Sequence, residues 1–134
     1  MKKRGFALIE ILTVITILAA LAIIAFTSFD KTKVKSDQNR AIAYLRAIRS
    51  AEKLCWTSGC GTGTSKTYAA LGNAAAINAT LGVEIQLPNY TFSVASGTST
   101  TFTATADTTG TTNDLTIDQD GNYTKGGAAF TPSY

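Results

Sequence analysis

The sequence contains no histidine, only two cysteines and only two prolines among its 134 residues. Without histidine, most serine–histidine and cysteine–histidine nucleophile arrangements are excluded. The two cysteines, Cys55 and Cys60, are separated by four residues, which fits neither the C-x-x-C redox motif nor a zinc site with four ligands. No phosphate-binding loop and no catalytic pair of carboxylates is recognisable. The sequence therefore predicts a protein that is not an enzyme and that binds no metal and no cofactor.

Charged residues are also scarce, at 16% of the chain, and they are unevenly placed. The formal net charge of +3 comes from a basic cluster at residues 2–4, since the remaining side chains are nine basic and nine acidic. Residues 30–53 hold seven basic and three acidic side chains, whereas residues 81–134 hold one lysine and five acids. The basic stretch lacks the interleaved aromatic platform of a nucleic-acid groove. We therefore expect an electrostatic seam between copies of the same protein.

The longest apolar run, residues 6–29, follows the basic cluster and contains one carboxylate, Glu10. As a helix this run is about 36 Å long, enough to cross a hydrocarbon core of about 30 Å. A charge there costs roughly 2.5–3.5 kcal/mol, so Glu10 needs a cationic partner. A cleaved secretory signal would end at the A-x-A-like site of residues 20–22, although the apolar run continues beyond it. A plain membrane anchor explains the length of the run but not the carboxylate.

A third interpretation comes from residues 3–12, with the sequence Lys-Arg-Gly-Phe-Ala-Leu-Ile-Glu-Ile-Leu. This stretch resembles the class III signal of type IV pilins and type II secretion pseudopilins. In that family a basic leader ends in glycine, phenylalanine usually follows, and glutamate is the fifth residue of the mature chain. The motif is specific because it fixes residue types and spacing together. Two departures are mild: Ala7 stands where threonine is common, and Thr27 and Ser28 occupy the place of a frequent proline.

The resemblance implies that residues 1–5 are a leader, which a prepilin peptidase removes between Gly5 and Phe6, and that the new Phe6 amine is methylated. Residues 6–29 are then a retained transmembrane helix that later forms the filament core, and residues 30–134 form the head. Glu10 would pair with the Phe6 amine of a neighbouring subunit. The implied partners are copies of the same chain, the prepilin peptidase, the pilus assembly platform and the inner membrane. The assembled pilus would lie at the cell surface.

The leading function is therefore a structural subunit of a type IV pilus, with a type II secretion pseudopilin as the alternative within the family. The calcium-loop pattern of major pseudopilins is missing, which favours the pilin. A single-pass anchored binding protein is the alternative from another class, and it would keep its N-terminus and form no filaments. Adhesion, motility, DNA uptake and electron transfer stay open as roles of the whole filament, and nucleic acid enters only in that way.

The helix is expected to continue to about residue 56, because residues 30–54 contain neither glycine nor proline and Gly59 supplies a stop signal. Apolar residues at spacings of 7, 4, 3 and 7 predict a stripe that packs on the head: Val34, Ala41, Leu45, Ile48 and Cys55. The basic residues of the same stretch are assigned to the solvated or subunit-facing side: Lys35, Arg40, Arg46, Arg49 and Lys53.

The remainder of the head is expected to be a connecting loop at residues 57–80, with one short helical turn at 68–71, and then an antiparallel sheet at residues 81–134. Period-2 patterns predict strands at residues 90–95, 100–106, 113–117 and 122–125, with turns at Gly97, Thr109-Gly110 and Asp120-Gly121. The apolar face of this sheet needs a cover, for which the helix stripe is the candidate. The predicted class is α+β, the pilin fold: a long N-terminal helix, with a transmembrane half and an amphipathic half, packed on about four strands.

Three smaller motifs have plain interpretations. Residues 118–122 begin like a calcium loop but lack the remaining oxygen ligands, so a tight turn is favoured. The Asn-x-Thr sequons at Asn78, Asn89 and Asn122 are no more than chance gives in a threonine-rich half, so they are no sign of glycosylation. In an exported domain, Cys55 and Cys60 predict a small disulfide loop.

Overall fold

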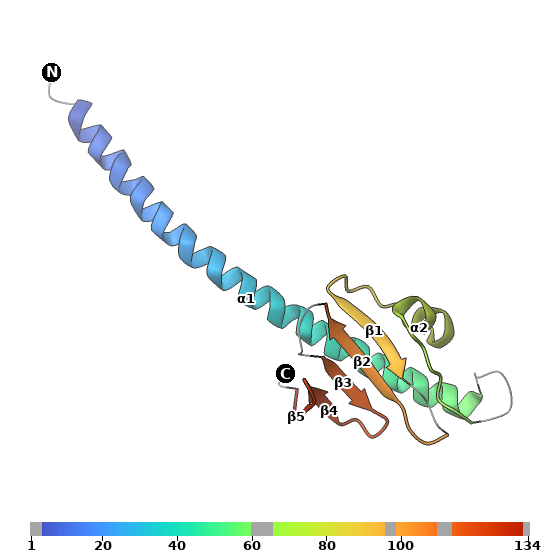
Figure 1. Ribbon diagram of the computed structural model, residues 1–134. Helices are drawn as coiled ribbons and strands as arrows, with labels where there is room; N and C mark the ends of the chain where they lie inside the picture. The colour runs from blue at the N-terminus through green and yellow to red at the C-terminus, as the bar shows by residue number, and fades with distance from the viewer. Residues whose placement is uncertain (1–3, 60–65, 96–98, 110–113, 133–134) are drawn as a thin grey trace. The chain divides into compact units, whose positions relative to one another are not determined.

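The computed structural model describes residues 4–59, 66–95, 99–109 and 114–132. Contacts divide the chain into two compact units, Met1–Ser36 and Asp37–Tyr134, and each is considered by itself. The elements follow in the order α1 (Arg4–Ser58), α2 (Ala74–Leu81), β1 (Tyr90–Ala95), β2 (Thr103–Thr108), β3 (Leu115–Asp118), β4 (Tyr123–Lys125) and β5 (Ala128–Phe130) (Figure 1). The predicted α+β fold, a long N-terminal helix with a C-terminal antiparallel sheet, is confirmed.

The described part of the first unit is helix α1 alone. No glycine or proline interrupts it after Gly5, so nothing in the sequence breaks the ladder of backbone hydrogen bonds. The hydroxyl group of Thr13 donates to the carbonyl oxygens of Ile9 (3.1 Å) and Glu10 (2.8 Å), and that of Thr16 donates to Thr13 (2.8 Å). The polar side chains of two threonines are thereby satisfied within the helix itself.

In the second unit, the α1 residues that face the sheet form a stripe with spacings of 4, 3, 4 and 3: Ala41, Leu45, Ile48, Glu52 and Cys55, each at most 3% exposed. Four of the five predicted stripe residues are therefore buried. Val34 is not, since 67% of it is exposed, and it belongs to the first unit. The stripe packs on one face of the sheet (Figure 1), where the rings of Tyr44 and Phe92 meet edge to face at 5.8 Å.

The helix ends at Ser58, two residues beyond the predicted limit of about 56. Gly59 adopts a φ of 75°, and its N–H donates to the carbonyl oxygen of Cys55 at 2.8 Å. A glycine in this left-handed conformation is a common end of an α-helix, because it satisfies a carbonyl group of the last turn without a steric penalty. The predicted stop signal is confirmed.

The sheet has the strand order β1-β2-β3-β4-β5, and all four pairs are antiparallel. Its inner face is built from the alternating residues Phe92, Val94, Ala104, Ala106, Leu115 and Ile117, each at most 3% exposed. Burial of a large apolar side chain such as Phe92 contributes roughly 1.5–3 kcal/mol. On the outer face, the register aligns a row of hydroxyl residues across four strands: Ser93, Thr105, Thr116 and Thr124.

The connecting segment differs from the prediction. Residues 68–71 form no helical turn; instead Leu71 pairs with Val94 through hydrogen bonds of 2.9 and 2.7 Å at the edge of β1. The helix lies later, at α2, within the predicted loop and at the start of the predicted sheet region. The side chain of Asn73 caps it by accepting the N–H of Ala76 at 2.8 Å, and Gly82 ends it with a φ of 66°. The signals for this helix were the cap residues on either side of a run of alanines.

The strand positions are close to the predicted ones, with one strand more than expected. The first strand matches β1 residue for residue, and β2 begins three residues later than predicted. The fifth strand, β5, was missed because three residues after Gly126 and Gly127 are too short for a period-2 pattern. Three predicted features fall wholly or partly outside the described residues: the turn at Gly97, the second residue of the Thr109-Gly110 turn and the beginning of the 113–117 strand.

Candidate functional site

The apolar part of α1 is the feature that an isolated chain in water does not explain. Every large apolar side chain described between Leu8 and Ile24 is more than half exposed, from 51% for Val14 to 72% for Leu8. These side chains occupy positions all around the helix, so no side of it is reserved for water. Among the described residues, α1 is the one helix that is long and apolar enough to cross a membrane, with a mean hydropathy of 2.7 and no burial in its most apolar window. The segment therefore needs lipid or other protein chains as its surroundings.

Glu10 lies on this segment with its side chain exposed. Its neighbours along the helix are apolar, and none of the described side chains forms an ion pair with it; the described pair, Arg40 with Asp37 at 3.9 Å, lies in the other unit. A carboxylate inside an apolar segment is expensive in hydrocarbon and marks a functional position. Among the side chains that the structure describes, none is therefore a cationic partner for Glu10.

The comparison with known families agrees with this geometry. Residues 1–26 match a family model described as the prokaryotic N-terminal methylation motif. The chain carries the type IV pilin and pseudopilin signature. That signature is typical of structural subunits with a membrane-anchoring N-terminal helix rather than of an enzyme family. A separate comparison with curated proteins found no match.

The other residues of the signature are placed only in part. The backbone of Gly5 and Phe6 is helical, as α1 begins at Arg4, and their side chains are not described. The basic leader residues Lys2 and Lys3 lie outside the described part. Of the two cysteines, Cys55 is 3% exposed in the last turn of α1, while Cys60 lies outside the described residues.

The basic residues of the second half of α1 divide into two groups. Lys35, Arg40, Arg46 and Lys53 are exposed, as predicted. Arg49 is not on the solvated side: it is half-buried, and its guanidinium group donates to the carbonyl oxygens of Gln119 (3.2 Å) and Asp120 (2.9 Å). The prediction was wrong for this residue, because a helix position beside the stripe can place a long arginine side chain over the edge of the sheet.

The segment that begins like a calcium loop is a tight turn between β3 and β4. Asp118 Oδ1 accepts the backbone N–H groups of residues 120, 121 and 122 at 2.8–2.9 Å, and its Oδ2 accepts the Asn122 side-chain amide at 2.9 Å. Partial burial would raise the pKa of Asp118, but the hydrogen bonds from Asn122, Gly121 and Asp120 together hold it below its ordinary value. The carboxylate serves the turn, as the tight-turn interpretation expected.

The asparagines of the three sequons are all engaged within the chain. Asn78 Oδ1 accepts the N–H of Ile85 at 3.0 Å, the Asn89 amide donates to Asp37 at 3.0 Å, and the Asn122 amide donates to Asp118 at 2.9 Å. Each side chain therefore holds a loop in place.

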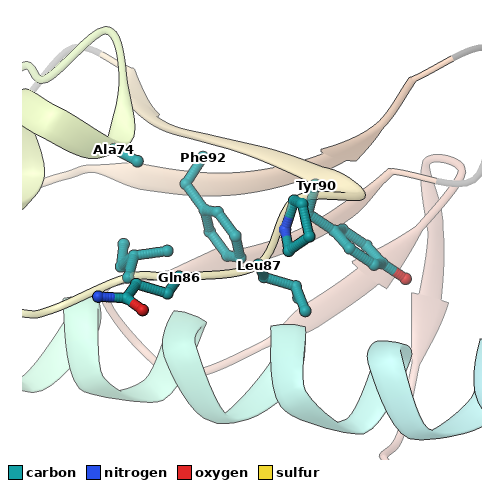
Figure 2. A pocket seen from close by; sticks show the side chains of 7 residues that line it. Ala74, Gln86, Leu87, Tyr90 and Phe92 are labelled. Atoms are coloured by element: carbon teal, nitrogen blue, oxygen red, sulfur yellow. The ribbon is translucent and has the colours of Figure 1, made fainter.

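A shallow apolar pocket of about 410 Å³ lies beside β1. Figure 2 shows the ring of Phe92 directed from β1 towards the segment with Gln86 and Leu87, and the ring of Tyr90 directed away from Gln86; Ala74 of α2 also lines the pocket. Burial, and secondly the negative charge of Asp37, raise the pKa of Tyr90. The lining offers no acid–base pair and no nucleophile, so the pocket supports packing rather than chemistry.

Sequence reasoning missed Glu52, which is fully buried on the inner stripe of α1. Its Oε2 accepts the N–H of Ala69 at 3.0 Å, while its Oε1 has no hydrogen-bond partner among the described residues. Burial raises its pKa, and the hydrogen bond from Ala69 offsets part of that rise. The spacing of the stripe could have predicted that Glu52 is buried, since position 52 falls between Ile48 and Cys55 on the same face of the helix.

Proposed function

We propose that this protein is the structural subunit of a type IV pilus. The observation that carries the proposal is the coincidence of three features on α1: the methylation motif, the exposed apolar surface and the carboxylate of Glu10, which forms no ion pair with any described side chain. In the membrane, the basic leader stays on the cytoplasmic side, as the positive-inside rule requires. The peptidase cuts between Gly5 and Phe6, and the Phe6 amine is methylated.

The amine of Phe6 then supplies the charge that Glu10 lacks. A secondary amine at a chain end is cationic at neutral pH, so the carboxylate of a neighbouring copy pairs with it once both leave the membrane. The pair fixes one subunit along the axis of the next, because each position on a helix corresponds to a rise of about 1.5 Å. The apolar surfaces between Leu8 and Ile24 cover one another in the filament core.

The head stays outside the membrane, and the outer face of its sheet faces solvent or neighbouring heads. The hydroxyl row on that face suits an exported surface, and the tight turn at Asp118 supports a pilin rather than a calcium-loop pseudopilin. A disulfide between Cys55 and Cys60 closes a small loop directly after α1. Such a bond would stabilise the fold chiefly by constraining the unfolded chain.

The experiment is the intact mass of the chain purified from membranes and from sheared filaments. We expect a chain that has lost residues 1–5 and has gained one methyl group at the Phe6 amine. A chain that begins at Met1 contradicts processing and favours an anchored binding protein, and one that begins after residues 20–22 indicates a secretory signal. Electron microscopy of the same cells then separates surface pili from a pseudopilus, which does not extend from the cell.

A further inference from the structure

A fully buried glutamate in a small domain calls for an explanation, because glutamate is almost never fully buried unless it is paired. Glu52 is 0% exposed, and none of the described cations forms an ion pair with it. One of its oxygens accepts a single backbone N–H, and the other has no described partner. A buried carboxylate in this state would be costly, whereas a protonated carboxyl group is neutral and loses far less on leaving water.

The charged groups on the elements around Glu52 are directed elsewhere. On α1, Arg49 bonds to the carbonyl oxygens of the β3–β4 turn, and Lys53 is exposed. On the opposing segment, the Lys66 ammonium group lies 5.2 Å above the ring of Trp56. No described cation therefore neutralises a charge on Glu52.

Other acidic and phenolic groups of the same unit have partners of their own. Asp118 is engaged by the peptide groups of its turn, and Asp120 accepts the side-chain amide of Gln119. The ring of Tyr68 stacks on Trp56 and packs against Phe102 at a centroid distance of 4.8 Å.

The partner of Glu52 lies on residues 66–71, here called the clasp. The clasp has no helix or strand of its own along most of its length. Hydrogen bonds to its backbone hold it at two points, the Glu52–Ala69 hydrogen bond and the Leu71–Val94 pairing at the sheet edge, and the ring of Tyr68 packs on Trp56 and Phe102. Its side chain Tyr68 covers Phe102, which is 1% exposed. Loss of the Glu52–Ala69 hydrogen bond would leave the clasp attached by the Leu71–Val94 pairing and by the ring contacts of Tyr68.

We propose that Glu52 is a pH-sensitive latch: its neutral carboxyl group holds the clasp on α1, and its ionisation at higher pH loosens the clasp. The ionised carboxylate is stabilised by hydration, and water can reach Glu52 only when the clasp moves away. The direction follows from the raised pKa: the folded state binds the proton more tightly than the unfolded state, so the stabilisation is complete at low pH and is lost as pH rises towards the folded value. The latch is independent of the proposed pilus function, because its test involves no filament.

The test compares hydrogen exchange at the Ala69 amide in the full chain, held in detergent micelles, for the wild type and Glu52→Gln. Glutamine keeps the size and the hydrogen-bond acceptor but cannot ionise. At pH 4.5 the two proteins should protect Ala69 equally; at pH 8 the wild type should protect it severalfold less than Glu52→Gln. Glu84→Gln, a change of an exposed glutamate in the same unit, should behave as the wild type at both pH values.

A parallel measurement needs no variant. Carbon NMR of the Glu52 carboxyl group in the wild type gives its titration, and the protection of Ala69 should fall around the same midpoint. The proposal is overturned if wild type and Glu52→Gln lose protection alike, if Glu52 titrates as an ordinary glutamate, or if the two midpoints differ. Should Glu52→Gln fail to fold, the wild type alone tests the proposal: the titration midpoint of Glu52 and the pH at which Ala69 loses half of its protection must agree.

Discussion

The guanidinium group of Arg49 occupies the space that a side chain at residue 121 would need. A Cβ atom built on Gly121 would lie 2.9 Å from Arg49 Cζ, and Gly121 has a φ of 96°. The same guanidinium group donates to the carbonyl oxygens of Gln119 and Asp120. Helix α1 and the β3–β4 turn are thus joined by an arginine whose guanidinium group lies against a glycine with a positive φ.

The first prediction concerns this contact. Gly121→Ala should lower the free energy of unfolding of the head by about 2–3 kcal/mol, the sum of a strained φ and a displaced arginine. Gly127→Ala separates the two effects, because Gly127 also has a positive φ of 81° but no atom within 4 Å of the added Cβ. It should cost only about 1 kcal/mol. Urea unfolding measures both values; equal losses for the two variants would show that the Arg49 contact contributes nothing.

The second prediction concerns the pH dependence of the β3–β4 turn. Asp118 has a pKa below its ordinary value in the folded protein. Its ionised form therefore adds to the free energy of unfolding at pH values above the pKa of an unfolded aspartate, and this stabilisation is lost as the pH falls through the pKa of Asp118 in the folded state. Asp118→Asn should therefore destabilise the head at pH 7 by about 1–2 kcal/mol, as loss of charge-assisted hydrogen bonds does.

The difference between Asp118→Asn and the wild type should shrink at pH 3 and below. Thermal unfolding at several pH values measures it, with Asp120→Asn as the control. The carboxylate of Asp120 is exposed and, among the described residues, accepts a hydrogen bond only from its neighbour Gln119. A difference that stays constant with pH would assign the effect to the shape of the side chain rather than to its charge.

These contacts show how far the sequence alone could go. The helix stripe around Leu45 and strand β1 could be predicted, because an element that is buried on one face carries apolar residues at a regular period, 3.6 for a helix and 2 for a strand. Arg49 could not be placed in the same way. An arginine beside the stripe can extend into water or over the sheet edge, and the choice depends on a turn 70 residues later.

Two further differences have the same origin. Residues 68–71 were expected to be helical because they contain tyrosine, alanines and leucine, yet the hydrogen bond from Ala69 to Glu52 and the stacking of Tyr68 hold them extended. At the N-terminus the motif around Glu10 was readable because it is local, with a fixed number of residues between its parts. The proposed partner of that carboxylate lies on a neighbouring copy, and neither pattern nor packing within one subunit reveals it.

The third prediction concerns the proposed disulfide. With Cys55 and Cys60 oxidised, the intact mass should be two hydrogens lower than after reduction and should shift on alkylation only after reduction. Closure of so short a loop stabilises the fold by about 2 kcal/mol. Reduction, or the double change to serine, should therefore lower the urea midpoint. Alkylation of the unreduced native chain at both cysteines would disprove the bond.

The fourth prediction concerns Glu10 and assembly. Glu10→Gln keeps the size of the side chain but removes its charge, so insertion into the membrane becomes easier while the pair with the Phe6 amine is lost. We expect normal levels of the processed, methylated subunit and a loss of filaments of roughly tenfold or more, since leaving one charge of a buried pair without its partner costs about 3–5 kcal/mol.

Glu10→Lys should abolish filaments altogether, because a like charge then faces the Phe6 amine. Glu84→Gln, at an exposed position of the head, should leave their number unchanged. Quantitative immunoblots of sheared filaments and of the membrane fraction measure assembly and processing separately. If Glu10→Gln subunits form filaments in normal numbers, the pairing with Phe6 is wrong, even where processing of the leader is intact. If they are not processed, Glu10 acts in recognition by the peptidase instead, and the register of the filament must be set by the apolar surface of α1.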